Sequence, residues 1–193
     1  MRIAILAVQG AFREHAQMLE MLGVSSVELR KKEDLAQAYD GLILPGGEST
    51  VQGKMLRELD MFATVKNQIQ MGMPVLATCA GMVLLAEEID GEEKAYLQTI
   101  PMVVKRNAYG RQLGSFCIEN DFKGVGTVPM TFIRAPYVSA IGKNVEILAK
   151  ENGHIAAVRY GRQIALAFHP ELCQNPAIHK LFLSMVSEYM NRK

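Results

Sequence analysis

Cys79 stands at the junction of a predicted buried strand and a predicted helix, where a thiol can act as a nucleophile. The apolar run 75–77 precedes it, and the apolar run 82–86 follows it. Ala77 and Gly81, two positions to either side, are small enough for a sharp turn that exposes the thiol at the carboxyl edge of a sheet. Unpaired N–H groups at a helix N-terminus favour the thiolate. The pattern predicts a nucleophile elbow, although a buried structural cysteine fits the same apolar run.

A candidate base and its orienting group follow a second predicted buried strand, 163–168, with an apolar run over 164–168. His169 comes directly after this run, and Glu171 lies two residues further on. The carboxyl ends of parallel strands meet at one edge of a sheet, so His169 can reach Cys79 while Glu171 orients the imidazole ring. Pro170 between them stiffens the turn. The order Cys79, His169, Glu171 therefore predicts a cysteine nucleophile with a histidine base.

A glycine pair after the predicted strand 41–44 can complete this chemistry, because acyl transfer needs N–H donors for the developing oxyanion. We predict that the N–H groups of Gly47 and Ala80 form the oxyanion hole. Glu48 beside them can receive a cationic group of a substrate. A plain Gly-Gly turn before a helix capped by Ser49 or Thr50 is the alternative explanation.

The remaining histidines and cysteines carry weaker signals. His15, His154 and His179 are expected to be structural or solvated. Cys117 and Cys173 belong to no CxxC or paired-histidine spacing, which argues against a zinc site. Metal-free thiol chemistry is therefore the better prediction.

Length and composition limit the possible classes. A chain of 193 residues with 49% hydrophobic content can bury one substantial core, so one domain over residues 1–193 is expected. The net charge of +1 argues against a nucleic-acid partner. The apolar runs are too short to span a membrane, and no signal peptide is expected. An odd number of cysteines, 3, fits a reducing cytoplasm.

The order of the predicted elements places these residues in an α/β fold. Strands and helices alternate up to about residue 88, which predicts a doubly wound, mostly parallel sheet with helices on both faces. Strands without intervening helices then predict an antiparallel extension in the second half. The predicted strands are 3–8, 27–29, 41–44, 75–78, 102–105, 115–118, 131–133, 146–149, 154–160 and 163–168, and the predicted helices are 12–22, 33–39, 60–71, 80–88 and 178–189.

Three motifs carry a family resemblance. PGGEST, TCAG and FHPEL, in this order, resemble the triad-type (class I) glutamine amidotransferases, whose fold is flavodoxin-like. The segments 8–15, 106–112 and 132–136 narrow the resemblance to the glutaminase subunits of pyridoxal 5′-phosphate synthase. The resemblance runs from residue 1 to about residue 190. Ala77 departs from it, because the family usually has glycine there.

The resemblance implies a role for each matching residue. Cys79 corresponds to the nucleophile, His169 to the general base and acid, and Glu171 to its orienting carboxylate. The implied glutamine-binding residues are Gly46, Gly47, Glu48, Arg106, Ile133 and Arg134. An ammonium group suits Glu48 and a carboxylate group suits Arg106, which agrees with L-glutamine as the ligand. Arg106 and Arg134 can also be explained as surface ion-pair residues.

The same resemblance implies an activity and a partner. The chain would hydrolyse L-glutamine to L-glutamate and ammonia through a cysteine thioester. A separate (β/α)8-barrel synthase subunit would take the ammonia to make pyridoxal 5′-phosphate, so this chain itself would bind no cofactor. Docking to that subunit would complete the oxyanion hole of a weakly active glutaminase, with the coupling expected near Gln9, Gly10, Gly46 and Gly47.

Two other classes of function remain open at this point. A peptidase or a γ-glutamyl hydrolase with the same elbow could share Cys79 and His169, but it would not need Glu48 and Arg106 as an amino-acid clamp. A binding or regulatory subunit could keep the fold without turnover. The intact set Cys79, His169 and Glu171 argues against that reading.

Overall fold

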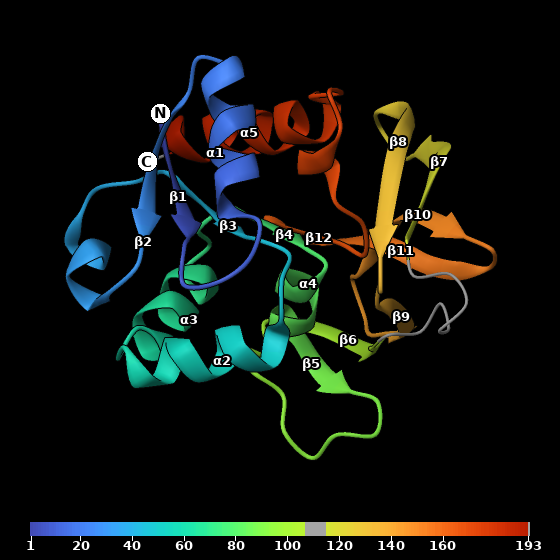
Figure 1. Ribbon diagram of the computed structural model, residues 1–193, viewed down its shortest axis with the longest axis horizontal. Coiled ribbons are helices and arrows are strands. Elements are labelled where there is room, and N and C mark those ends of the chain that lie inside the picture. The colour runs from blue at the N-terminus through green and yellow to red at the C-terminus, as the bar shows by residue number, and fades with distance from the viewer. Residues whose placement is uncertain (107–114, 193) are drawn as a thin grey trace.

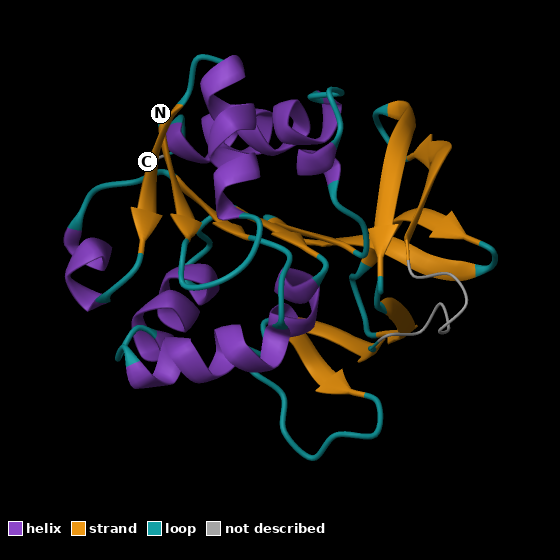
Figure 2. Cartoon of the chain, viewed as in Figure 1, coloured by secondary structure: helices purple, strands orange, loops and turns teal. Residues whose placement is uncertain are grey.

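A mixed β-sheet lies between two layers of helices in the computed structural model, which describes residues 1–106 and 115–192 (Figure 2). Helices α1 (Phe12–Met21) and α5 (Ala177–Met190) cover one face of the sheet (Figure 1). The other face carries α2 (Ser49–Glu58), α3 (Phe62–Gln70) and α4 (Ala80–Leu85) (Figure 1). This arrangement confirms the predicted α/β class with helices on both faces.

The parallel half of the sheet sets the edge at which the candidate residues meet. Its order is β2-β1-β3-β4-β12, and the central strands β3 and β4 are buried along their whole length, as their continuous apolar sequences require. Leu44 of β3 pairs with Ala77 of β4, and Thr78 of β4 pairs with Leu166 of β12. The three strands therefore end at nearly the same level. Their bounds are β1 Arg2–Leu6, β2 Ser25–Leu29, β3 Gly41–Leu44, β4 Val75–Thr78 and β12 Gln163–Leu166.

The second half extends this sheet with mostly antiparallel strands, as predicted. Strand β11 pairs antiparallel with β12, β10 and β9, and β9 pairs antiparallel with β6. Strands β7 and β8 form a separate antiparallel pair (Figure 1). The bounds are β6 Ile100–Lys105, β7 Ser115–Phe122, β8 Gly126–Ile133, β9 Tyr137–Ile141, β10 Glu146–Glu151 and β11 His154–Tyr160.

Several predicted elements were wrong in type or extent. The helix predicted over 80–88 ends at Leu85, and β5 (Ala86–Ile89) follows because this segment pairs parallel with β6. Helix α2 was considered only in the alternative explanation of the glycine pair, and its N-cap is Glu48. Strand β9 was not predicted, and the helix predicted over 33–39 is a short 3-10 helix, η1 (Lys32–Ala36). Residues 107–112 of the family motif lie outside the described residues. Among the described helices, none is both long and apolar enough to cross a membrane.

The turn at Cys79 has the strained backbone of a nucleophile elbow. Cys79 has φ 47° and ψ −100°, a positive φ that side chains other than glycine rarely adopt. Helix α4 then turns back so closely that a Cβ atom on Gly81 would overlap the carbonyl oxygen of Leu44. The residue at position 81 is therefore limited to glycine by packing between α4 and β3, which accounts for the sequence signal around Cys79.

Candidate active site

Cys79 and His169 meet because β4 and β12 run parallel in register. Cys79 follows Thr78 directly, and His169 comes three residues after the partner of Thr78, Leu166. The backbone N–H of Cys79 donates to the carbonyl of Leu166 at 2.7 Å, which ties the two strand ends together. The side chains of Cys79 and His169 flank the same point beside Gly46, where a Cβ atom would lie within 3.3 Å of both, and only 8% of Cys79 is exposed. The structure therefore places the predicted nucleophile and base side by side.

Glu171 holds the His169 ring from the other side. His169 Nδ1 lies 2.7 Å from Glu171 Oε1, and both side chains are buried. The backbone N–H of His169 donates to the backbone carbonyl of Thr131 at 2.8 Å. Pro170 begins the short 3-10 helix η2 (Pro170–Leu172), which carries Glu171. The compact turn explains how residues two positions apart can face each other.

Neighbouring groups stabilise the protonated form of His169. Burial opposes a charge on the ring, but the hydrogen bonds to Cys79 and Glu171 and their charges outweigh burial and raise the pKa of His169 to about 10. Burial also opposes the charge on Glu171, and the adjacent rings of His15 and His169 outweigh it and lower the pKa of Glu171. His169 therefore carries a proton at neutral pH that can be given to a leaving group.

This proton predicts a pH dependence of stability. His169 has a higher pKa in the folded protein than in the unfolded chain, where it is near 6.5. The stabilisation is fully present below about pH 6.5 and is lost as the pH rises through about 10. We expect the free energy of unfolding to fall more steeply between pH 7 and pH 10 in the wild type than in His169→Gln. Urea unfolding under reducing conditions measures both slopes, and equal slopes would contradict the assignment.

The loop after β3 leaves one backbone N–H without an acceptor among the described residues. Gly46 N–H donates to Thr78 Oγ1 at 2.9 Å, and Glu48 N–H donates to Gln9 Oε1 at 2.8 Å. Gly47 N–H between them has no hydrogen-bond acceptor among the described residues. Ala80 begins α4, where N–H groups have no partner within the helix. Both predicted oxyanion donors therefore lie on elements that adjoin Cys79.

Gly46 is packed against the predicted nucleophile and the predicted base. A Cβ atom at this position would overlap His169 Cε1 and lie 2.8 Å from His169 Nδ1 and 3.3 Å from Cys79 Cβ. Any side chain here would displace the imidazole ring. The first glycine of the pair thus leaves room for His169, while Gly47 carries the candidate oxyanion donor.

The two charged residues of the predicted substrate clamp, Glu48 and Arg106, form an ion pair with each other. Arg106 Nη2 lies 3.1 Å from Glu48 Oε1, and Arg106 Nη1 lies 2.9 Å from Glu92 Oε1. The cavity beside Cys79 measures only about 40 Å³. It is lined by Gly47, Glu48, Ser49, Cys79, Ala80, Val83, Arg106, Arg134 and Pro136. The carbonyl of Ile133, which is a further predicted residue, lies 3.9 Å from Cys79 Sγ.

Sequence reasoning missed two buried histidines behind the triad. His15 and His179 are fully buried, so of the two expected alternatives, structural or solvated, they fit the structural one. His15 Nδ1 lies 3.0 Å from His179 Nε2, and His15 Nε2 lies 3.5 Å from Glu171 Oε2. The sequence contained a signal for this burial, because each histidine falls within the apolar stripe of an amphipathic helix.

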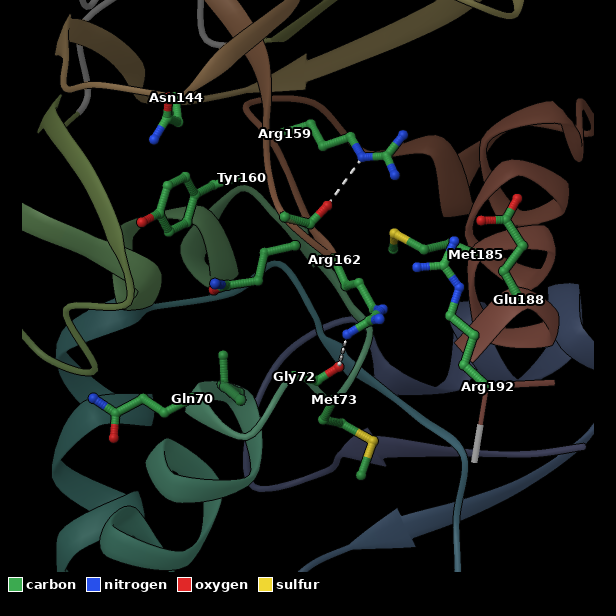
Figure 3. Close-up of a pocket in the computed structure, with 13 residues that line it drawn as sticks. Gln70, Gly72, Met73, Asn144, Arg159, Tyr160, Arg162, Met185, Glu188 and Arg192 are labelled. Carbon is green, nitrogen blue, oxygen red and sulfur yellow. Dashed lines mark hydrogen bonds between the residues drawn. The ribbon is translucent and has the colours of Figure 1, made fainter. Parts of the chain in front are cut away.

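A larger cavity lies at the other end of the parallel strands (Figure 3). It has a volume of about 630 Å³ and opens where β4 and β12 begin, near Gly72 and Arg162. Arg159 and Arg162 donate to the carbonyls of Gly161 and Gly72, as the dashed lines in Figure 3 show. None of the triad residues lines this cavity, so its size does not make it the site of thiol chemistry.

Comparisons with known proteins agree on one family. The model of the SNO glutamine amidotransferase family matches residues 5–188. A relative named pyridoxal 5′-phosphate synthase subunit PdxT, from Desulfitobacterium hafniense, is 59% identical over 97% of this chain and 94% of its own length. A relative of the same name from Haemophilus influenzae is 54% identical over 96% of this chain and 98% of its own length. A solved structure described as a glutamine amidotransferase has a TM-score of 0.91 and 41% identity, covering 96% of this chain and 98% of that one.

Proposed function

Because this chain belongs to the SNO glutamine amidotransferase family, we propose that it hydrolyses L-glutamine and hands the ammonia to a pyridoxal 5′-phosphate synthase. Residues 1–193 act as one glutaminase domain in the cytoplasm, and the acceptor is a separate (β/α)8-barrel subunit. The observation that carries the proposal is the position of Cys79 beside the His169–Glu171 pair at the carboxyl ends of β4 and β12.

The first half-reaction forms a thioester. The thiolate of Cys79 attacks the carboxamide carbon of glutamine, and the carbonyl π electrons move to the oxygen. The N–H groups of Gly47 and Ala80 stabilise this oxyanion. When the tetrahedral intermediate collapses, the C–N bond breaks and His169 gives its proton to the leaving nitrogen. Ammonia and a glutamyl thioester on Cys79 result.

The second half-reaction releases glutamate. His169, now without its proton, takes one from a water molecule as that water attacks the thioester carbon. The C–S bond breaks, the thiolate of Cys79 is restored, His169 keeps the proton taken from water, and the released carboxyl group gives its own proton to solvent. Glu171 stabilises the charged imidazole ring in the resting protein and again at the end of the cycle.

The clamp selects the free amino acid. Glu48 binds the ammonium group and Arg106 the carboxylate, while Gly46, Ile133 and Arg134 shape the wall around the side chain. The cavity of about 40 Å³ is too small for a whole amino acid, so binding requires the Glu48–Arg106 pair to open. Docking of the synthase near Gln9 and Gly47 is the event that we expect to favour the open form.

The proposal is tested by ammonia release from L-glutamine, measured for the chain alone and with a barrel synthase subunit from the same organism. We expect glutamate and ammonia in equal amounts, a rate that rises when the synthase is added, and no hydrolysis of glutamine within a peptide. Equal hydrolysis of γ-glutamyl peptides would instead favour a γ-glutamyl hydrolase. Glutamine turnover that is indifferent to the synthase would remove the proposed partner.

A further inference from the structure

Two histidines that the proposed reaction does not use lie behind Glu171. His15 comes from α1 and His179 from α5, two helices that cover the same face of the sheet (Figure 1). Both side chains have no exposed surface, and their rings are tilted by 52° with centroids 5.2 Å apart. Burying two polar rings costs stability unless their nitrogen atoms are paired, so the pair needs a physical explanation.

Both rings are neutral in the folded protein. Burial lowers the pKa of His15, and burial is the largest cause that lowers the pKa of His179 to about 3. A neutral imidazole has one N–H and one bare nitrogen. The contact of 3.0 Å between His15 Nδ1 and His179 Nε2 therefore joins one donor and one acceptor, and the surroundings decide which is which.

The surroundings of His15 Nε2 place the proton there. This nitrogen lies 3.5 Å from Glu171 Oε2 and 3.3 Å from Thr78 Oγ1. Glu171 Oε2 is buried and has no hydrogen bond within the described residues. A bare His15 Nε2 would turn its lone pair towards this anionic oxygen, which is repulsive, whereas an N–H there is attractive even at 3.5 Å. His15 thus carries its proton on Nε2 and accepts at Nδ1.

The choice at His15 fixes the tautomer of His179. His179 must then donate from Nε2 to His15 Nδ1, which leaves His179 Nδ1 as a bare nitrogen. That atom indeed lacks a hydrogen-bond partner in the described part of the chain. The opposite arrangement leaves both a buried carboxylate oxygen and a buried N–H unpaired, which costs more.

On the basis of the proposed function, we propose that His15 is a positioning residue of the triad, holding Glu171 Oε2 through Nε2–H, with His179 fixing its tautomer. Glu171 is then held at both oxygens, by His169 at 2.7 Å and by His15 on the other side. The same N–H faces Thr78 Oγ1, which accepts from Gly46 N–H at 2.9 Å. His15 therefore links the carboxylate of the triad to the loop that carries the oxyanion donor.

The tautomers can be measured without any assay of activity. Long-range proton–nitrogen correlation spectra of the chain labelled with ¹⁵N-histidine distinguish protonated from bare ring nitrogens. The chain has only 4 histidines, and single substitutions assign them. At neutral pH we expect protons on Nε2 of both His15 and His179. A proton on His15 Nδ1, or a charged His15, would overturn the proposal even if glutamine is hydrolysed as proposed.

Kinetics then test the effect on the triad. In the complex with the synthase, His15→Phe keeps a ring without a donor, and we expect kcat to fall about 10- to 100-fold with KM nearly unchanged. His15→Gln can place an amide N–H near the former Nε2 and should recover most of kcat. His154→Phe, which keeps the ring stacked on Tyr137, serves as the matched control. Equal kcat in His15→Phe and His15→Gln would overturn a donor role.

The pH profile separates positioning from a merely structural role. Without the His15 donor the pKa of Glu171 rises, so the acidic limb of kcat/KM should move to higher pH in His15→Phe and not in His154→Phe. An unmoved limb contradicts the proposal. An inactive wild type would instead refute the proposed function and leave the spectra to decide the tautomers. The titratable groups that face the cluster are His169, Cys79, Cys173, Glu14 and His179.

Discussion

Replacing Cys79 with alanine should lower kcat for glutamine hydrolysis by at least roughly 10⁴-fold, because the thioester route is then closed. The remaining groups can still bind and polarise the amide, but water is a far poorer nucleophile than a thiolate. The ion pair between Glu48 and Arg106 does not involve Cys79, so the affinity for glutamine should change little. Ammonia release under single-turnover conditions in the synthase complex measures the rate.

Two further measurements make this expectation specific. Calorimetric titration of the complex of Cys79→Ala with glutamine should give a dissociation constant close to the wild-type value. Mass spectrometry of the wild type, quenched during turnover, should show a glutamyl adduct on the peptide that contains Cys79. Residual turnover within 100-fold of the wild type, or an adduct on Cys117 or Cys173, would remove Cys79 as the nucleophile.

Gly46→Ala should lower kcat by about 10²- to 10³-fold, because misplacing a reacting group by even 1 Å has an effect of this order. The added Cβ atom would occupy the space of the His169 ring edge and press on Cys79 Cβ. Since the ring must stay in line with both Cys79 and Glu171, its displacement weakens proton transfer in both half-reactions. Steady-state kinetics with the synthase measure kcat and KM separately.

Gly142→Ala is a matched control for crowding. Its Cβ atom would lie 2.9 Å from Pro101 Cβ, away from the residues that line the cavity at Cys79. We expect Gly142→Ala to lower the melting temperature while leaving kcat unchanged, and Gly46→Ala to lower kcat at temperatures where it is fully folded. A normal kcat in folded Gly46→Ala would show that His169 is not held by the loop.

The core of the site could be predicted because its information is local. The small residues around Cys79 and the apolar runs before Cys79 and His169 specify strands that end at one edge. The pairing of Thr78 with Leu166 cannot be read from the sequence. It is set when β4 and β12 become neighbours in the parallel sheet. The class of the sheet and the proximity of Cys79 to His169 were therefore predictable. The distances between the site residues were not.

The parts that could not be predicted depend on tertiary contacts. The segment Ala86–Ile89 has a helical sequence pattern but pairs with β6, so an interaction with a distant strand decides its structure. His15 and His179 are 164 positions apart, and only the packing of α1 beside α5 makes them neighbours of Glu171. The pairing of Arg106 with Glu48 is equally non-local, because the sequence shows two suitable charges but not that they neutralise each other.

The Glu48–Arg106 ion pair has a consequence for how the protein discriminates among amides. Each side chain already has a counterion before any ligand arrives, at 3.1 Å. A free zwitterionic amino acid can replace both counterions at once, so no charge is left bare during the exchange. A glutamine inside a peptide offers neither charge and cannot separate the pair. On the proposed assignment, such amides are rejected at the entrance, before they come within reach of the thiol.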